Sequence, residues 1–91
     1  MRYAVSIAGA FKKSVKKMQK RGLDLSLLET IIESIANREK LEPKYRDHEL
    51  SGICKGLREC HIKPDWLLIY LVDEEEQVVT LVNTGSHSDL F

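Results

Sequence analysis

The first third of the chain changes its hydrophobic period near residue 8. Residues 3–7 alternate large apolar and small side chains, which predicts a short β-strand. From about Ala8 onward, apolar residues recur every three or four positions, the pattern of amphipathic helices. Two helices are therefore predicted, with these apolar residues on their inner faces: Ala8, Phe11, Val15 and Met18 in the first, and Leu27, Leu28, Ile31, Ile32 and Ile35 in the second.

Capping residues set the expected ends of these helices. Gly22 follows the last residue of the first pattern, where a left-handed glycine commonly ends a helix. Ser26 and Glu29 have the spacing of a capping box for the second helix, and Asp24 is the alternative cap. Pro43 marks the end of the helical part.

The second half has the patterns of a β-meander. From Tyr45 the chain is expected to form a sheet, with Arg58, Cys60 and Ile62 on one side of a strand and Leu57, Glu59 and His61 on the other. Residues 63–65 are predicted to form a turn. The apolar run 66–72 is predicted to be a central strand covered on both faces, and residues 77–84 are predicted to be its hairpin partner. A short polar tail follows Gly85.

The order of these elements predicts an α+β fold. It is a β-α-α-β-meander in which two N-terminal helices pack on one face of a mainly antiparallel sheet. At 91 residues the chain is expected to form one domain, residues 1–91, with 43% apolar and 31% charged residues, as in globular proteins.

The charge is zero overall but is unevenly distributed. Residues 1–21 carry seven lysines and arginines and no acid, whereas residues 73–76 are all acidic. Such runs are ordinarily solvated surface, but a local basic patch can also bind a polyanion. No apolar run approaches the roughly 20 residues that span a bilayer, and the N-terminus lacks the regions of a signal peptide. We therefore expect a cytoplasmic protein without a membrane partner.

The cysteines and histidines do not form a recognisable metal motif. Cys54 and Cys60 are six positions apart, which suits neither a CxxC knuckle nor a disulfide framework, so both are expected as thiols. His48, His61, His87 and Asp65 are potential ligands, but HExxH and CxxC spacings are absent. The sequence predicts no metal and no other cofactor.

The three histidines are the strongest candidates for chemistry. His48, His61 and His87 each lie at a predicted strand end or loop, and in a meander these edges can meet at one rim of the sheet. Imidazole both accepts and donates protons near neutral pH. Asp65 would lie beside this rim, where it could orient a histidine or act as a base; its structural alternative is a turn cap beside Pro64.

Aromatic and basic residues near the histidines suggest nucleic-acid binding. Trp66 and Phe91 could stack on unpaired bases or could instead close the core. Lys55, Arg58 and Lys63 could bind phosphates. Arg58 could also stabilise a transition state, or it could instead pair with neighbours of Glu59 or with a helix carboxylate.

Three segments resemble the YafQ-like branch of the RelE/ParE toxin superfamily. They are Tyr45–Gly52, the block from Lys55 through Cys60-His-Ile-Lys-Pro-Asp-Trp66 to Tyr70, and the ending Thr84-Gly-Ser-His-Ser-Asp-Leu-Phe91. The length and element order fit as well. The resemblance implies a RelE-like fold and the function of a type II toxin. Such a toxin is a ribosome-dependent endoribonuclease that contacts rRNA and cuts mRNA in the ribosomal A site. A cognate antitoxin inhibits it.

The resemblance also implies roles for individual residues. The catalytic residues of the family correspond to His48, His61, Asp65 and His87 in this chain, and the resemblance implies that Trp66 and Phe91 shape the site. The reaction it implies is metal-independent, with the RNA 2′-hydroxyl attacking the adjacent phosphate. His87 is then the expected acid, and Asp65 or His61 the base.

The chain departs from the family pattern at three positions. Asn83 replaces a common arginine, Cys54 a common tryptophan, and Leu57 a common aromatic residue. The loss of a phosphate-binding charge at position 83 motivates an alternative, in which the protein is a weak or inactive family member that binds antitoxin and co-regulates its operon. The gyrase-poisoning branch of the superfamily is less favoured because it lacks this histidine set.

Overall fold

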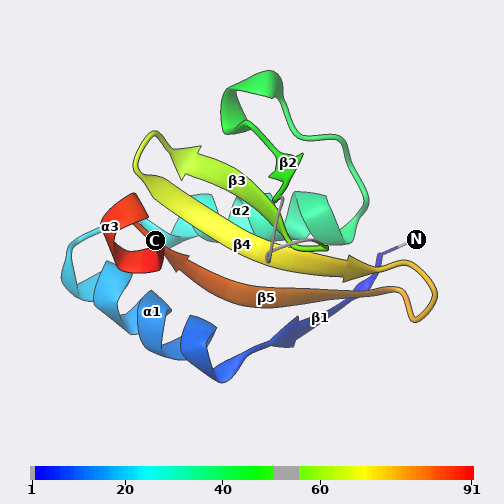
Figure 1. Cartoon of the computed structure of the whole chain (residues 1–91), viewed down its shortest axis with the longest axis horizontal. Helices are drawn as coiled ribbons and strands as arrows, with labels where there is room; N and C mark the ends of the chain where they lie inside the picture. The colour runs from blue at the N-terminus through cyan, green and yellow to red at the C-terminus, as the bar shows by residue number, and fades with distance from the viewer. Residues whose placement is uncertain (1, 51–55) are drawn as a thin grey trace.

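Five strands form one mixed sheet in a computed structural model of the chain, which describes residues 2–50 and 56–91 (Figure 1). The sheet order is β1-β5-β4-β3-β2. β1 runs parallel to β5, and every other pair is antiparallel, which confirms a mainly antiparallel sheet. The strands are β1 (Ala4–Ile7), β2 (His48–Glu49), β3 (Arg58–Lys63), β4 (Trp66–Asp73) and β5 (Val78–Gly85).

The helical elements are α1 (Gly9–Lys20), α2 (Leu25–Ala36), the 3-10 turn η1 (Pro43–Tyr45) and α3 (His87–Leu90). The predicted α+β architecture is confirmed, with α1 and α2 supplying the helical layer. Among the described residues, no helix combines the length and the apolar character needed to cross a bilayer.

The ends of α1 and α2 follow from local chemistry. α1 ends at Lys20 with Arg21 as its C-cap, and the next residue, Gly22, has a φ of +83° that lets the Leu23 N–H reach the Met18 carbonyl at 3.1 Å. This confirms the predicted glycine cap. At the start of α2 the Ser26 capping box is wrong and the alternative is right: the Asp24 carboxylate accepts the Ser26 N–H at 3.0 Å and its hydroxyl at 2.6 Å. Ser26 already lies inside the helix and therefore donates.

The apolar stripes of both helices pack on the sheet. Phe11 and Met18 of α1 are buried, as are four residues of α2, namely Leu28, Ile31, Ile35 and Ala36. The prediction that Leu27 faces inward is wrong, because this residue is 37% exposed. The buried cluster is Phe11, Met18, Leu28, Ile31, Ile35, Cys60, Ile62, Trp66, Leu68, Tyr70, Val79 and Leu81.

Strands β3 and β4 have the side-chain alternation that the sequence predicts. Residues 66–70 of β4 are all buried, as expected for a central strand covered on both faces. On β3, Cys60 and Ile62 belong to the core cluster. Glu59 and His61 consequently point to the opposite face.

Two segments differ from the prediction. Pro43 does not end the helical part but starts η1, where its fixed φ suits the first position of a helical turn. The polar tail forms helix α3, because Ser86 and Asp89 make a reciprocal capping box: the Asp89 carboxylate accepts the Ser86 N–H at 2.8 Å and the Ser86 hydroxyl accepts the Asp89 N–H at 3.2 Å.

A buried hydrogen-bond chain joins β4 and β5 beneath α3. The Trp66 indole N–H donates to the Thr84 hydroxyl at 3.0 Å, and that hydroxyl donates to the Leu67 carbonyl at 2.6 Å. Trp66 is 2% exposed and Thr84 is also buried, so water cannot replace these partners.

Replacing Thr84 with valine should lower the free energy of unfolding by about 1–3 kcal/mol, because the indole N–H would be buried without an acceptor. Urea denaturation measures the difference. Thr80→Val makes the same change at a half-buried position of β5 and is the matched control. Equal losses in the two variants would show that the hydrogen-bond chain adds no stability.

Candidate active site

Two of the three predicted histidines meet at one end of the sheet. His61 comes from β3 and His87 is the first residue of α3, which lies beside the turn from β3 to β4 (Figure 1). The centroids of the two imidazole rings are 5.7 Å apart, with an interplanar angle of 59°. The structure therefore brings together two proton-transfer groups that are 26 positions apart in the sequence.

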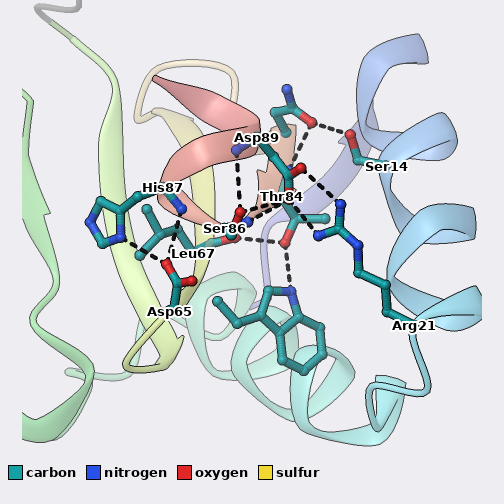
Figure 2. Close-up of polar contacts among 10 residues, drawn as sticks. Ser14, Arg21, Asp65, Leu67, Thr84, Ser86, His87 and Asp89 are labelled. Atoms are coloured by element: carbon teal, nitrogen blue, oxygen red, sulfur yellow. Dashed lines mark hydrogen bonds and ion pairs between the residues drawn. The ribbon is translucent and has the colours of Figure 1, made fainter.

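Asp65 fixes the orientation of His87. One carboxylate oxygen, Oδ1, accepts the backbone N–H of His87 at 3.1 Å and lies 3.0 Å from Nδ1 of its ring (Figure 2). These hydrogen bonds, the backbone one first, lower the pKa of the Asp65 carboxyl below its usual value. An ionised carboxylate only accepts, so Nδ1 carries a hydrogen and Nε2 is the nitrogen left for a substrate.

His61 has a carboxylate of its own, which the sequence analysis missed. Nε2 of His61 lies 3.2 Å from Oε1 of Glu59, and Nδ1 lies 3.3 Å from the Pro64 carbonyl oxygen. Glu59 is 5% exposed, unusually buried for an acid. The period-two alternation on β3 already placed Glu59 and His61 on one face, and that signal could have identified the pair.

His48 lies near this group without joining it. Its backbone is directly opposite Glu59 in the β2–β3 register, so both side chains leave the same face of the sheet. Nδ1 of His48 lies 2.6 Å from the Arg46 carbonyl oxygen, and the residue is exposed. Among the described residues, it makes no hydrogen bond to the other histidines.

A groove of about 610 Å³ runs beside His61. Its charged lining residues are Lys44, Arg46 and Lys63, with no acid among them, and Tyr45 adds an aromatic ring. Lys63 was predicted as a phosphate ligand; the other three were not, because η1 was not recognised as a turn that brings them to β3. The full lining is Leu27, Lys44, Tyr45, Arg46, His61, Ile62, Lys63 and Pro64.

Arg58 lies away from the histidine pair. Its guanidinium donates to Oδ2 of Asp47 at 2.9 Å, and this contact raises the pKa of Arg58. The other carboxylate oxygen of Asp47, Oδ1, accepts a hydrogen bond from the Tyr70 hydroxyl. Arg58 is thus paired with a carboxylate, but its partner lies between η1 and β2 and not in a helix. Lys55 and Cys54 lie outside the described residues.

The two predicted aromatic residues lie in different environments. Trp66 belongs to the core and is almost fully buried, so no base can stack on it while the core is intact. Its stacking role is therefore not supported, and core closure is the role it has. Phe91 is 66% exposed, with its ring 6.5 Å from that of His87, and can stack on a base beside the histidines.

Asn83 and Cys60 take no evident part in chemistry. The side-chain oxygen of Asn83 accepts hydrogen bonds from the Ser14 hydroxyl of α1 and from the Thr84 N–H, so a neutral, half-buried group occupies this position. Burial raises the pKa of the Cys60 thiol to about 12, so the thiol is not a nucleophile at neutral pH.

Glu59, His61 and His87 could hold a metal ion. Each offers one ligand atom, and these atoms lie within 4.8 Å of one another. Imidazole nitrogens with a carboxylate suit zinc or copper. Motif spacing missed this set because its members come from β3 and from α3.

The chain matches the family described as "Bacterial toxin of type II toxin-antitoxin system, YafQ" over residues 3–91. It is 35% identical over 88 residues to the mRNA interferase toxin YafQ of Escherichia coli K12, covering 96% of this chain and 94% of the relative.

Solved toxin structures also superpose closely on this chain. A metal-bound toxin from Helicobacter pylori superposes with a TM-score of 0.92 at 43% identity, covering 98% of this chain and 99% of the toxin. The E. coli DinJ–YafQ toxin–antitoxin complex superposes with a TM-score of 0.90 at 34% identity, covering 100% of this chain and 99% of the matched one.

The Asp65–His87 contact predicts a measurable titration. The Asp65 carboxyl should titrate below the usual value of about 3.9, and His87→Ala should move its midpoint upward because one of two hydrogen bonds to the carboxylate is lost. Because the folded-state pKa is lowered, the contact stabilises the fold above about pH 4, and this contribution is lost as pH falls toward the folded-state value. Carboxyl-detected NMR measures the midpoint.

His48→Ala is the control for this titration, since His48 does not contact Asp65. A midpoint that is unchanged in His87→Ala, or equally changed in both variants, would contradict the pairing.

Proposed function

Because the chain belongs to the YafQ family of bacterial type II toxins, we propose that it is an mRNA interferase that cuts translated mRNA in the ribosomal A site. The chemistry we propose is metal-independent phosphodiester transfer within the RNA. One observation carries this proposal: two imidazoles lie side by side, and one ring nitrogen of each lies within 3.2 Å of a carboxylate oxygen.

The reaction needs one proton taken and one given. The RNA 2′-oxygen forms a bond to the adjacent phosphorus while the bond from phosphorus to the 5′-oxygen breaks. The 2′-hydroxyl proton goes to a base, and the 5′-oxygen receives a proton from an acid. The products are a 2′,3′-cyclic phosphate and a 5′-hydroxyl end. Two imidazoles separated by 5.7 Å can flank one phosphate.

His87 is the proposed acid. Asp65 holds Nδ1, which leaves Nε2 of an exposed ring to deliver the proton to the leaving oxygen. The Asp65 carboxylate also stabilises the charged imidazolium before transfer. Phe91, next to this ring, is proposed to hold a base of the RNA by stacking.

His61 is the proposed base. Both of its ring nitrogens have partners, Glu59 at Nε2 and the Pro64 carbonyl at Nδ1, so the RNA 2′-hydroxyl has to replace one of these contacts before His61 takes its proton. The nearby Glu59 carboxylate stabilises the imidazolium that then forms. Asp65 is the weaker candidate because its oxygen already accepts two hydrogen bonds and its pKa is lowered. His48, on the same face as Glu59, completes the proposed catalytic set at the edge of the site.

The basic groove is proposed to hold the RNA backbone. Lys44, Arg46 and Lys63 line it beside His61, and positive charge there stabilises the phosphate as its charge increases in the transition state. Lys55 remains a proposed phosphate ligand. Arg58 would join only after leaving Asp47.

A cognate antitoxin is the proposed protein partner. The E. coli relative was solved in complex with DinJ. In this chain the exposed lysines of α1 form a one-sided basic face to which an acidic antitoxin segment would be attracted; they are Lys12, Lys13, Lys16, Lys17 and Lys20. Because the proposed substrate is on ribosomes, the proposed place of action is the cytoplasm.

A second candidate function follows from Asn83. Position 83 carries no charge and is hydrogen-bonded to α1 through Ser14, so it cannot supply the phosphate contact that the family resemblance implies. The second candidate is a binding module that docks antitoxin, co-regulates its operon and cleaves weakly or not at all.

Cleavage of translated mRNA separates the two candidates. Wild-type protein added to a translation reaction should create new 5′ ends within codons, detected by primer extension. His87→Ala and His61→Ala should each lower the cleavage rate roughly 10²–10⁴-fold, since each removes a proton-transfer group.

Ser88→Ala is the matched control for His87→Ala, because Ser88 is an exposed neighbour on the same short helix. New 5′ ends that persist at full rate in both histidine variants would refute the acid–base proposal. A wild-type protein that produces no new ends but binds antitoxin would establish the binding module.

Metal independence has its own test. A chelator selective for transition metals, used in magnesium-containing buffer, should leave the cleavage rate within about twofold. Added zinc should inhibit, because binding by Glu59, His61 and His87 occupies the nitrogens that move protons. Activity that disappears on chelation and returns with zinc would instead make the metal a cofactor.

A further inference from the structure

Helix α3 carries His87 but cannot hold its own position. It has four residues, none of them buried. Isolated helices far longer than this are marginal in water, because the first turn fixes several residues for one hydrogen bond. The placement of His87 therefore depends on contacts between α3 and the rest of the protein.

Among the described residues, two side chains from other elements form hydrogen bonds with α3, one at each end of the turn. Asp65 binds the first residue, His87. Arg21 binds the third residue, Asp89, with Nη1 2.6 Å from Oδ2 and Nη2 2.9 Å from Oδ1 (Figure 2). The Asp89 side chain is only 18% exposed, against 71% for Asp65, so the Arg21 contact is the better shielded of the two.

Arg21 is itself well anchored. It is the C-cap residue of α1, a helix of 12 residues whose Phe11 and Met18 are in the core. On the other side, Asp89 lies against Gly85: a Cβ added at Gly85 would be 2.8 Å from the Asp89 Cβ and 2.9 Å from its Oδ2. The Asp89 carboxylate is thus held between a fixed guanidinium and the end of β5.

We propose that Arg21 is a positioning residue for His87: its two hydrogen bonds to Asp89 clamp α3 onto α1 and so hold the His87 ring beside His61. Arg21 acts through Asp89 and the α3 backbone and does not touch the reacting phosphate. The catalytic consequence rests on the function proposed above, whereas the structural consequence does not.

An exposed ion pair contributes little to the free energy of unfolding of the whole protein, so the Arg21–Asp89 pair should have little effect on global stability. The equilibrium that matters here is the docking of one helical turn without a buried side chain, and a small energy is enough to shift it.

The structural arm of the test measures backbone order by ¹⁵N relaxation. In wild type, residues 86–90 should have order parameters of about 0.85, and in Arg21→Ala these should fall below about 0.6, the range of flexible backbone. Arg21→Lys should lie between, because an ammonium cannot form the paired contact. Order parameters that stay at the wild-type level in Arg21→Ala would overturn the proposal.

Arg38→Ala is the matched control. Arg38 is also an exposed arginine, 3.0 Å from the Glu74 carboxylate, in the turn at the opposite end of the sheet from α3 (Figure 1). The variant removes the same charge and a similar ion pair, and should leave residues 86–90 ordered. Equal loss of order in both variants would also overturn the proposal.

The kinetic arm uses translated mRNA. Arg21→Ala should lower kcat about tenfold with KM unchanged, because a misplaced His87 slows proton transfer without removing a substrate contact. A rise in KM at constant kcat would assign Arg21 to RNA binding and overturn positioning. A wild-type protein without cleavage would refute the proposed function, and the relaxation measurements would still decide whether Arg21 holds α3.

Discussion

The arrangement of the site depends on one carboxylate, that of Asp65, which forms hydrogen bonds with a residue far away in the sequence. Asp65, in the turn between β3 and β4, accepts both the backbone N–H and the ring Nδ1 of His87, 22 residues later. The backbone contact ties the start of α3 to the turn between β3 and β4, and the ring contact orients the imidazole. Without this bond the His87 ring would lose the contact that sets its orientation, and among the side-chain contacts of the described residues only the Arg21–Asp89 ion pair would still tie α3 to the body of the protein.

The two imidazoles differ in how their carboxylates are placed, and this difference suggests the division of work between them. Asp65 is open to solvent, so His87 belongs to a site that can meet a leaving group and exchange protons with water. Glu59 is buried behind His61, so a charge that forms on His61 has a fixed counter-ion in a low dielectric. A metal ion would use the same nitrogens, which makes metal binding and proton transfer competing states of one set of atoms.

Periodicity was sufficient to predict the strands of the meander, the two main helices and the face of β3 that carries His61, because each depends on local sequence and burial. It failed where a pattern was short or its partner distant. Leu27 has the spacing of a core residue but is 37% exposed and lines the groove beside His61. Glu59 was overlooked because an acid in a strand ordinarily faces water. The pairing of Arg21 with Asp89 joins residues 68 positions apart, and no local signal encodes it.

The neutral residue at position 83 changes where positive charge can act on a substrate. Asn83 faces α1 through Ser14, so this part of β5 offers a phosphate no cation of its own. Lys44, Arg46 and Lys63 line the groove on the His61 side, where they can act on a phosphate that approaches the pair from that direction. The groove therefore places positive charge on the His61 side of the pair and not at position 83.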